Sequence, residues 1–252
     1  MSTAGPGPRK DYPPARNDAP LVVFDFDHTL YDGDSGSHLF AWLIRRSAWR
    51  MLLAALIAPV AGPMIAFLPT RRRGIGAFVW AGTVFERHDF DALVDAYVAL
   101  NTDGIRRRLL PVALDVLHRH RAAGDRVVIA PGAPPRLARA ILAFVAHEDL
   151  PVVGTRVERR LGAMMATQHC HHEMKMTMLR EAGFGGGVDA AYSDSTADLP
   201  LLQAARRPVV VNPKPKGMEF FRQRLPAGTP MLNWGCPGRA GDPAPGDATA
   251  PY

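Results

Sequence analysis

Short apolar runs recur at five places along the chain. They are rich in Val, Ile and Ala and end beside Gly, Pro or acidic residues, which is typical of buried strands. The runs cover residues 21–24, 126–130, 151–154, 188–193 and 208–211. We expect them to be strands of one sheet.

Helical periodicity occupies most of the chain between these runs. After the second strand it predicts helices over residues 134–147, 173–182, 198–205 and 214–224. Strands that alternate with helices in this way are typical of a parallel sheet covered on both faces. The sequence therefore predicts an α/β fold with a doubly wound parallel sheet.

The interval between the first two strands interrupts this alternation. Its patterns favour helix over residues 37–60, 71–85, 90–101 and 111–123. We therefore predict an α/β core of residues 20–30 and 125–234 with an inserted all-helical cap domain, residues 31–124. Residues 1–19 and 235–252 are rich in Pro, Gly and small polar side chains, and we expect both to be disordered tails.

The stretch that begins at Met51 and ends at Thr70 carries no charged side chain and approaches the length of a membrane span. Pro59 and Pro63 argue against one straight helix. One interpretation is a buried helix pair with a turn at residues 59–63. The other is a peripheral membrane contact, a shallow hairpin whose flanking arginines meet anionic head groups. The flanking residues are Arg45, Arg46, Arg50, Arg71, Arg72 and Arg73.

Composition narrows the class of protein. A chain of 252 residues with 47% hydrophobic and 21% charged residues fits a folded globular protein. Its net charge of +6 favours anionic partners, but no basic and aromatic recognition motif is present, so no nucleic-acid partner is expected. Cys170 and Cys236 are too few for a disulfide framework, and no signal peptide is evident. We expect a cytoplasmic protein, at the inner face of the membrane if the bilayer interpretation holds.

Two carboxylates, Asp25 and Asp27, follow the first predicted strand. In open α/β sheets ligands bind beyond the carboxyl ends of strands, so reacting groups are expected here. Carboxylates this close repel one another unless a cation lies between them, and Mg²⁺ prefers oxygen ligands. The pair therefore predicts a magnesium site.

Residues 25–29, Asp-Phe-Asp-His-Thr, resemble the first motif of the haloacid dehalogenase-like phosphatases. The resemblance implies that Asp25 attacks phosphorus to form an aspartyl-phosphate. It implies that Asp27 protonates the leaving group and then activates water. Thr29 would contact the phosphate.

Two later motifs also match this family. Residues 192–202 resemble its fourth motif, with Ser193 where the family has glycine. This implies that Asp194 binds Mg²⁺ directly, together with Asp25 and Asp27, and that Asp198 binds or supports the metal. An alternative is that Asp198 only caps its helix. Lys175 is one of four lysines in an arginine-rich chain and matches the third motif, which implies a cation that holds Asp25 and the phosphoryl charge.

The second motif departs from the family pattern. Members place Ser or Thr at the end of the second strand, and this chain has Pro131, which offers neither a hydroxyl nor an N–H. The N–H groups of Gly132 and Ala133 remain for phosphate binding, with Lys175. Losing one donor commonly costs about 3 kcal/mol of transition-state stabilisation, so we expect a slowed enzyme.

The resemblance is strongest to the phosphoserine phosphatase-like subgroup with a helical cap, which includes phosphatidylglycerophosphatase C-like enzymes. It implies a Mg²⁺-dependent phosphomonoester hydrolase, and the uncharged stretch favours a lipid phosphate such as phosphatidylglycerophosphate. One alternative is a soluble phosphatase of phosphoserine or a small phosphoalcohol. Another is a phosphate-sensing or scaffold protein with weak catalysis, which Pro131 would support.

Three further features lie near these motifs. The run of residues 169–172, His-Cys-His-His, alternates faces in an extended segment, so its side chains are not expected to share one metal ion. His28 is an alternative substrate contact. The polar residues at the start of the insert, Asp32, Asp34 and Ser35, receive no role.

Overall fold

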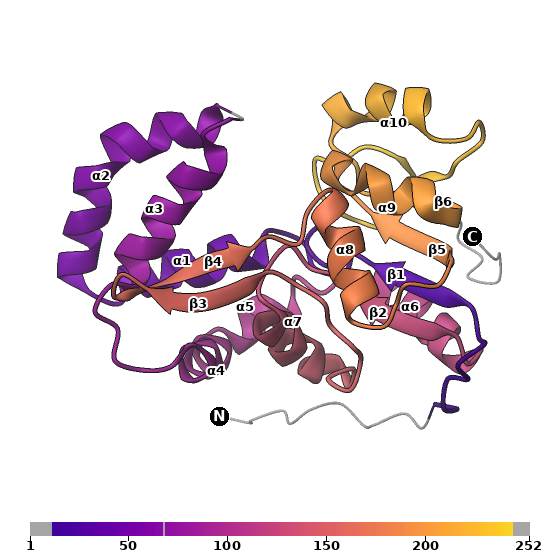
Figure 1. The fold of residues 1–252 in the computed structure, drawn as a ribbon, viewed down its shortest axis with the longest axis horizontal. Coiled ribbons are helices and arrows are strands. Elements are labelled where there is room, and N and C mark those ends of the chain that lie inside the picture. Colours follow the sequence, from indigo (N-terminus) through magenta and orange to yellow (C-terminus); the bar gives the residue numbers. More distant parts are fainter. Residues whose placement is uncertain (1–11, 68, 244–252) are drawn as a thin grey trace.

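The computed structural model describes residues 12–67 and 69–243. The large sheet is parallel, with the order β2-β1-β5-β6-β7-β8. Its strands are β1 (Leu21–Phe24), β2 (Arg126–Ile129), β5 (Val188–Ser193), β6 (Ala205–Val211), β7 (Met231–Asn233) and β8 (Asp242–Pro243). Helices lie on both sides of it (Figure 1), which confirms the predicted doubly wound parallel sheet.

Alternate residues of β1 face two separate apolar clusters. Val22 and Phe24 pack with α6 and α7, whereas Leu21 and Val23 pack with α8, α9 and α10. These helices are α6 (Pro111–Ala122), α7 (Pro135–Leu142), α8 (Glu173–Glu181), α9 (Leu199–Ala204) and α10 (Met218–Arg224). No residue of β1 is more than 2% exposed, so this strand is the centre of the core and Asp25 follows directly from it.

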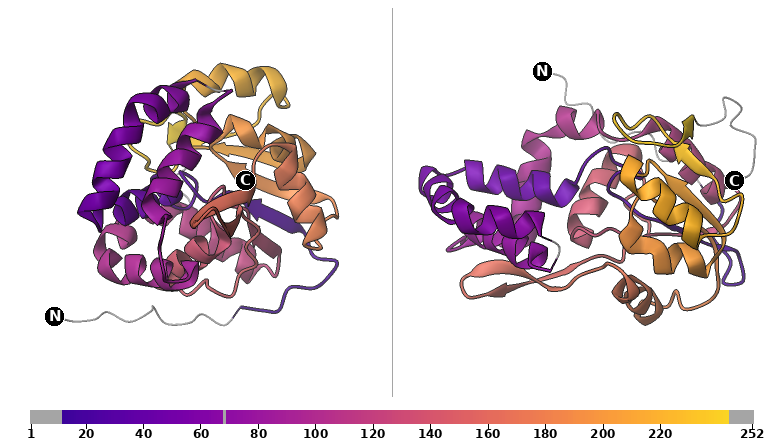
Figure 2. Two further views of the ribbon diagram at one scale, coloured as in Figure 1. Left: turned by 60° about the vertical axis from the view of Figure 1, so that its left-hand side comes forward. Right: turned by 90° about the horizontal axis from the view of Figure 1, so that it is seen from above.

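The segment between β1 and α6 is helical, as predicted. It contains α1 (Ser35–Arg45), α2 (Ala48–Ala66), α3 (Arg71–Thr83), α4 (Phe90–Leu100) and α5 (Thr102–Arg106). Apolar residues of α1 and α4 belong to the same core cluster as β1, and α6 packs on β2. The helical insert therefore shares a core with the sheet, and only α2 and α3 project from it, at the end away from β5 and β6 (Figures 1 and 2).

The predicted turn at residues 59–63 is wrong. Helix α2 continues through Pro59 and Pro63, and the chain reverses only after Ala66, before α3 begins. The two helices approach closely at Gly74, where a Cβ atom would lie 2.7 Å from the carbonyl oxygen of Ala61. This close packing offsets the backbone hydrogen bonds that the two prolines remove.

An antiparallel hairpin that the sequence patterns did not predict extends along the insert. It consists of β3 (Arg156–Arg160) and β4 (Ala163–Gln168), and it packs against α3. The backbone N–H of Met164 donates to Thr83 Oγ1 (3.0 Å), and the N–H of Phe85 donates to the carbonyl of Gly162 (2.9 Å). The projecting unit around α3 is therefore not all-helical.

Several predicted elements differ in detail. The helix predicted over 37–60 is two helices, because α1 ends at Arg45 and α2 begins at Ala48. Residues 151–154 form one isolated bridge, Val152 beside Ile129, at the edge of the sheet rather than a strand. The helix predicted over 134–147 is α7 followed by a 3-10 turn, Ala143–Val145. The helix predicted over 214–224 begins as a 3-10 turn, Pro215–Gly217, before α10.

The expected tails lie partly outside the described residues, which end at 243 and begin at 12. Within them the chain differs from the expectation. The Arg121 guanidinium lies 4.0 Å from the centroid of the Tyr12 ring, Cys236 is about 1% exposed, and β8 pairs with β7. The composition of these segments did not predict the contacts, because the contacts depend on a few specific side chains.

Candidate active site

The carboxyl ends of β1, β2 and β5 lie side by side. Phe24, the last residue of β1, is opposite Ile129 in β2 and Tyr192 in β5. The N–H of Asp25 donates to the carbonyl of Tyr192 (2.9 Å), which fixes the backbone where the strand ends. Parallel pairing thus brings the first, second and fourth predicted motifs to one edge of the sheet.

Lys175 joins two of the predicted carboxylates. Its Nζ lies 3.0 Å from Asp25 Oδ1 and 2.6 Å from Asp198 Oδ2, and its side chain is 1% exposed. Burial alone would lower the pKa of Lys175, but Asp198 and Asp25 raise it overall. The lysine is therefore a permanent cation in the site, held in place from two sides.

Ser193 explains one departure from the family motif. Its hydroxyl donates to Asp198 Oδ2 (2.7 Å) and accepts from the N–H of Ser195 (3.1 Å). Asp198 makes no side-chain capping bond at the start of α9, so the capping interpretation is wrong. Since its Oδ2 receives both Lys175 and Ser193, Asp198 supports the site through Lys175.

Asp25 is buried with several charges around it. Burial raises the pKa of this carboxyl, Lys175 lowers it, and Asp198, Asp194 and Asp27 raise it again. Asp27 is less buried, and its Oδ1 accepts from the N–H of Ser35 (2.8 Å) at the start of α1. Burial and the charge of Asp34 raise the pKa of Asp27 to about 7. A carboxyl with this pKa can exchange a proton near neutral pH.

Asp194 has a partner that the sequence analysis missed. Arg239, from the segment after β7, places a guanidinium nitrogen 3.0 Å from Asp194 Oδ2 and 3.3 Å from the carbonyl of Asn212. Burial still raises the pKa of Asp194 to about 6, against the effect of Arg239. Composition placed Arg239 in an expected tail, so no sequence signal pointed to it.

The residues present fit a hard divalent cation. Burial raises the pKa of Asp25, Asp27 and Asp194, and Asp194 also raises the pKa of the other two. A cation between these carboxyls would stabilise their charged forms. Asp198 Oδ1 is buried without a hydrogen-bond partner, although its Oδ2 has two. Oxygen donors of this kind are the ligands of Mg²⁺.

The predicted phosphate contacts surround the same edge. Thr29 is fully buried, and its hydroxyl has no hydrogen-bond partner. The carbonyls of Gly132 and Ala133 accept from Thr155, which anchors the loop after β2. Pro131 precedes Gly132 and packs closely against Gly154, where a Cβ atom would lie 2.9 Å from Pro131 Cγ. The proline ring is therefore tightly packed in the loop that follows β2.

His171 lies against this loop and was not predicted as a site residue. A Cβ atom on Gly132 would lie 2.5 Å from His171 Cε1, so the imidazole packs directly against the glycine. Burial and the charge of Lys175 lower the pKa of His171 to about 4. A neutral imidazole thus borders the expected phosphate position.

The His-Cys-His-His run does not gather around one point. Cys170 is buried, with its N–H donating to Thr155 Oγ1 (3.0 Å), while the backbone N–H of His172 donates to Ala197. No cluster of metal-ligating atoms includes this run within the described chain.

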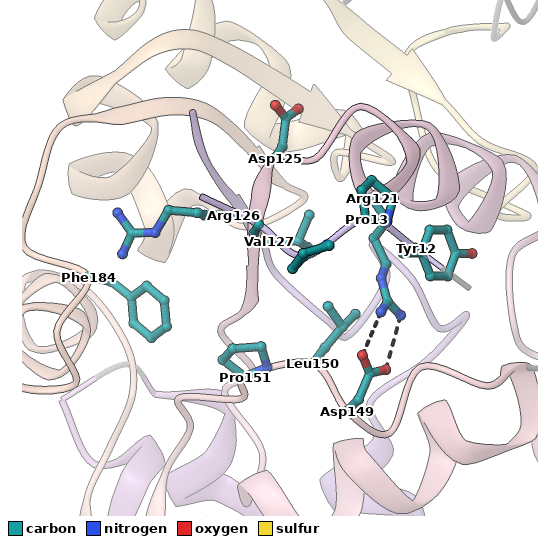
Figure 3. A pocket seen from close by; sticks show the side chains of 12 residues that line it. Tyr12, Pro13, Arg121, Asp125, Arg126, Val127, Asp149, Leu150, Pro151 and Phe184 are labelled. Carbon is teal, nitrogen blue, oxygen red and sulfur yellow. Dashed lines mark hydrogen bonds and ion pairs between the residues drawn. The ribbon is translucent and has the colours of Figure 1, made fainter. Parts of the chain in front are cut away.

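A surface hollow of about 310 Å³ lies at the opposite end of β2 (Figure 3). Arg126 and Val127, at the start of that strand, line it together with Tyr12 and the Arg121–Asp149 ion pair (2.5 Å). The hollow is therefore beyond the amino ends of the strands, away from the carboxylates.

Comparison with known proteins identifies the same family over the residues that contain the predicted motifs. The sequence profile of the haloacid dehalogenase-like hydrolases matches residues 22–203. Protein CicA of Caulobacter vibrioides (strain NA1000 / CB15N) is 31% identical over 216 residues, covering 80% of this chain and 86% of CicA.

Solved structures share the fold at lower identity. A protein of unknown function from Bordetella pertussis Tohama I superposes with a TM-score of 0.62 and 24% identity, covering 82% of this chain and 96% of that one. A phosphoserine phosphatase with a phospho-aspartyl intermediate analogue gives 0.51 and 14%, covering 82% and 91%. Identities this low establish the common fold, and they leave the chemistry to the residues of the site.

Proposed function

This chain belongs to the haloacid dehalogenase-like hydrolases, and we propose that it hydrolyses phosphate monoesters with Mg²⁺ through an aspartyl-phosphate on Asp25. The observation that carries the proposal is Lys175, which is buried between Asp25 and Asp198 at the end of the central strand. A fixed cation there orients one oxygen of Asp25 and offsets negative charge on a phosphoryl group.

In the first step the second carboxylate oxygen of Asp25 attacks phosphorus, and the ester P–O bond breaks. Asp27, whose pKa is about 7, gives its proton to the leaving oxygen. In the second step Asp27 takes a proton from water, the resulting hydroxide oxygen attacks the phosphorus, and the Asp25–phosphorus bond breaks. Phosphate leaves, and both aspartates return to their starting states.

Other groups of the site bind rather than react. We assign the phosphoryl oxygens to Lys175, the hydroxyl of Thr29 and the N–H groups of Gly132 and Ala133. Bound Mg²⁺ would offset charge on the phosphoryl group. Its ligands would be Asp25, Asp194 and the backbone carbonyl of Asp27, with Asp198 in support.

The test is turnover by the Asp25→Asn variant against a panel of phosphate esters with Mg²⁺. We expect this variant to lose measurable turnover while circular dichroism shows that it is folded at the assay temperature, because an amide is a poor nucleophile. Asp115→Asn, an exposed aspartate on α6, is the matched control and should keep wild-type rates. Near-normal turnover by Asp25→Asn would refute the assignment.

We further propose that the substrate is a lipid phosphate met at a membrane surface. Helix α2 has a mean hydropathy of 1.6, yet only 17% of its most apolar window is buried. Its most exposed apolar residues are Met51, Leu52, Leu56 and Val60, at 51%, 62%, 68% and 69%. Because exposure of these apolar side chains to water is unfavourable, we infer that they contact the apolar part of a lipid surface.

The flanking arginines support this surface only in part. Arg50 is buried and pairs with Glu86 (3.0 Å), so it is not free to meet head groups. Arg46 lies 3.7 Å from the same carboxylate, and its side chain is 31% exposed. Arg45 and Arg72 are exposed near the two ends of the α2–α3 hairpin and remain available. The predicted role of Arg50 at a membrane is therefore wrong.

Vesicle flotation tests this second proposal. The wild-type protein should float with vesicles that contain phosphatidylglycerol, and the Leu52→Glu/Leu56→Glu variant should stay in the dense fraction. Leu100→Glu alters a leucine on α4 that is 75% exposed, and should float like the wild type. If the double variant floats equally well, α2 is not the contact. If the wild-type protein itself does not float, the rival is a soluble phosphatase, for which phosphoserine or a small phosphoalcohol would be the best substrate in the panel.

A further inference from the structure

Three side chains with different ligand atoms meet beside the carboxylate site. They are His28 and Asp32, from the loop after β1, and Cys236, from the segment after β7. Cys236 Sγ lies 2.9 Å from Asp32 Oδ1 and 3.9 Å from His28 Nδ1, and the last two atoms are 4.0 Å apart. More than 200 residues of chain separate Cys236 from its two neighbours, so the fold itself creates this cluster.

The distances between these atoms suit a borderline-soft divalent ion. Zinc binds sulfur at about 2.3 Å and nitrogen or oxygen at about 2.0–2.2 Å, so tetrahedral ligand atoms lie roughly 3.3–3.6 Å from one another. The three observed separations, from 2.9 to 4.0 Å, bracket these values. The mixture of nitrogen, sulfur and oxygen also differs from the all-oxygen set of the carboxylate site, which suits Mg²⁺.

The backbone at each ligand is held by hydrogen bonds. His28 has a φ of 57°, and its carbonyl accepts from Asn212 Nδ2 (2.7 Å). The N–H of Asp32 donates to the carbonyl of Arg108 (2.6 Å), and the Arg108 guanidinium donates to the carbonyl of Asp32 (3.0 Å). The N–H of Cys236 donates to Asn233 Oδ1 (2.9 Å). The three ligand residues are therefore already close together in the metal-free protein, which reduces the conformational entropy lost when an ion binds.

Exposure of the cluster provides an entry path. Cys236 is 1% exposed, whereas the side chains of His28 and Asp32 are 27% and 32% exposed. An ion can thus enter from the histidine and aspartate side and reach a thiol that is shielded behind them.

We propose that His28, Asp32 and Cys236 form a zinc site with three protein ligands and a water in the fourth position. When the ion binds, the Cys236 thiol releases its proton to solvent and the thiolate becomes the ligand. Binding would fasten the segment after β7 to the loop that leads into the helical insert. The site is independent of the phosphatase proposal, because its test measures metal binding without substrate.

Cobalt substitution is the direct test, because Co²⁺ bound to a thiolate has an intense near-ultraviolet charge-transfer absorption. The wild-type protein should develop this band at one Co²⁺ per chain, and Zn²⁺ should remove it. Cys236→Ser should lack the band. Cys170→Ser, which alters the other buried cysteine, should retain it.

The other two ligands are tested by affinity. His28→Gln and Asp32→Asn should each weaken Zn²⁺ binding by at least about tenfold, while Asp194→Asn should leave the cobalt band intact. Circular dichroism and metal-free melting verify that each variant is folded. The proposal is overturned if wild-type protein gives no thiolate band, if the band survives in Cys236→Ser, or if it disappears in Cys170→Ser or Asp194→Asn. Wild-type Zn²⁺ affinity in both His28→Gln and Asp32→Asn would overturn it as well.

Discussion

Lys175 is a buried cation between two carboxylates. Its ammonium group faces Asp25 and Asp198 with about 1% of the side chain exposed. Without it, two carboxylates would remain in a buried environment with no cation between them. Breaking a buried ion pair from one side commonly costs about 3–5 kcal/mol, because a charge is left uncompensated.

We therefore expect Lys175→Met to lower the free energy of unfolding by about 3–5 kcal/mol, measured by urea denaturation at neutral pH. Lys216→Met, at an exposed position just before α10, is the control and should change it by less than about 0.5 kcal/mol. Equal stability of the Lys175→Met and wild-type proteins would mean that the buried carboxylates carry protons rather than charge.

Pro131 offers a second residue-scale test. The proline ring fixes φ near −65°, a value that threonine also adopts, so Pro131→Thr restores a hydroxyl and an N–H without imposing a new backbone conformation. The gain approaches about 3 kcal/mol of transition-state stabilisation, or on the order of a hundredfold in kcat/KM. Steady-state rates on the best substrate measure it. Two equally inactive proteins would instead favour the phosphate-sensing alternative.

At the scale of elements, Glu86 ties the projecting helices to the chain that follows α3. Its carboxylate receives Arg50 from α2 (3.0 Å) and His88 Nδ1 (2.8 Å), and its side chain is 7% exposed. Burial alone would raise the pKa of Glu86, but hydrogen bonds from His88 and Arg50 lower it to about 2. The unfolded chain therefore binds a proton at a higher pH than the folded protein does.

This pKa sets the direction of the pH dependence. A depressed carboxyl pKa contributes stability above its ordinary value of 4.5, and this contribution is lost as pH falls toward about 2. Between about pH 6 and pH 3 the wild type should lose roughly 2 kcal/mol more unfolding free energy than Glu86→Gln, which has no carboxyl to titrate. Urea denaturation at both pH values tests this. Parallel losses in the two proteins would show that Glu86 is not the titrating group.

The sequence predicted elements with strong periodicity and failed where local signals were weak. Buried runs such as residues 188–193 are strands at the expected positions, so the predicted motifs that follow these strands also lie where they were expected. The β3–β4 hairpin was missed because its turn is Leu161-Gly162, both at positive φ, and leucine is a rare residue in such a turn. At α2, the prolines suggested a break that packing against α3 overrides.

At the scale of the whole molecule, residues after the last long strand return to the site. Asn212, fully buried after β6, contacts both the His28 carbonyl (2.7 Å) and the N–H of Trp234 (2.6 Å), and Arg239 reaches Asp194. No short-range pattern encodes contacts across such distances in sequence. For this reason the motifs found Asp25, Asp194 and Lys175, but not the residues that surround them.

The contact between Arg239 and Asp194 makes a prediction about metal affinity. The guanidinium occupies one oxygen of a carboxylate that we assign to Mg²⁺, so the two cations compete for it. Arg239→Gln should strengthen Mg²⁺ binding about fivefold, corresponding to roughly 1 kcal/mol of charge interaction, in calorimetric titration without substrate. Arg222→Gln, an exposed arginine on α10, should bind Mg²⁺ like the wild type. Unchanged binding by Arg239→Gln would show that the arginine does not compete with the metal, and weaker binding would show that it holds Asp194 in the position that Mg²⁺ requires.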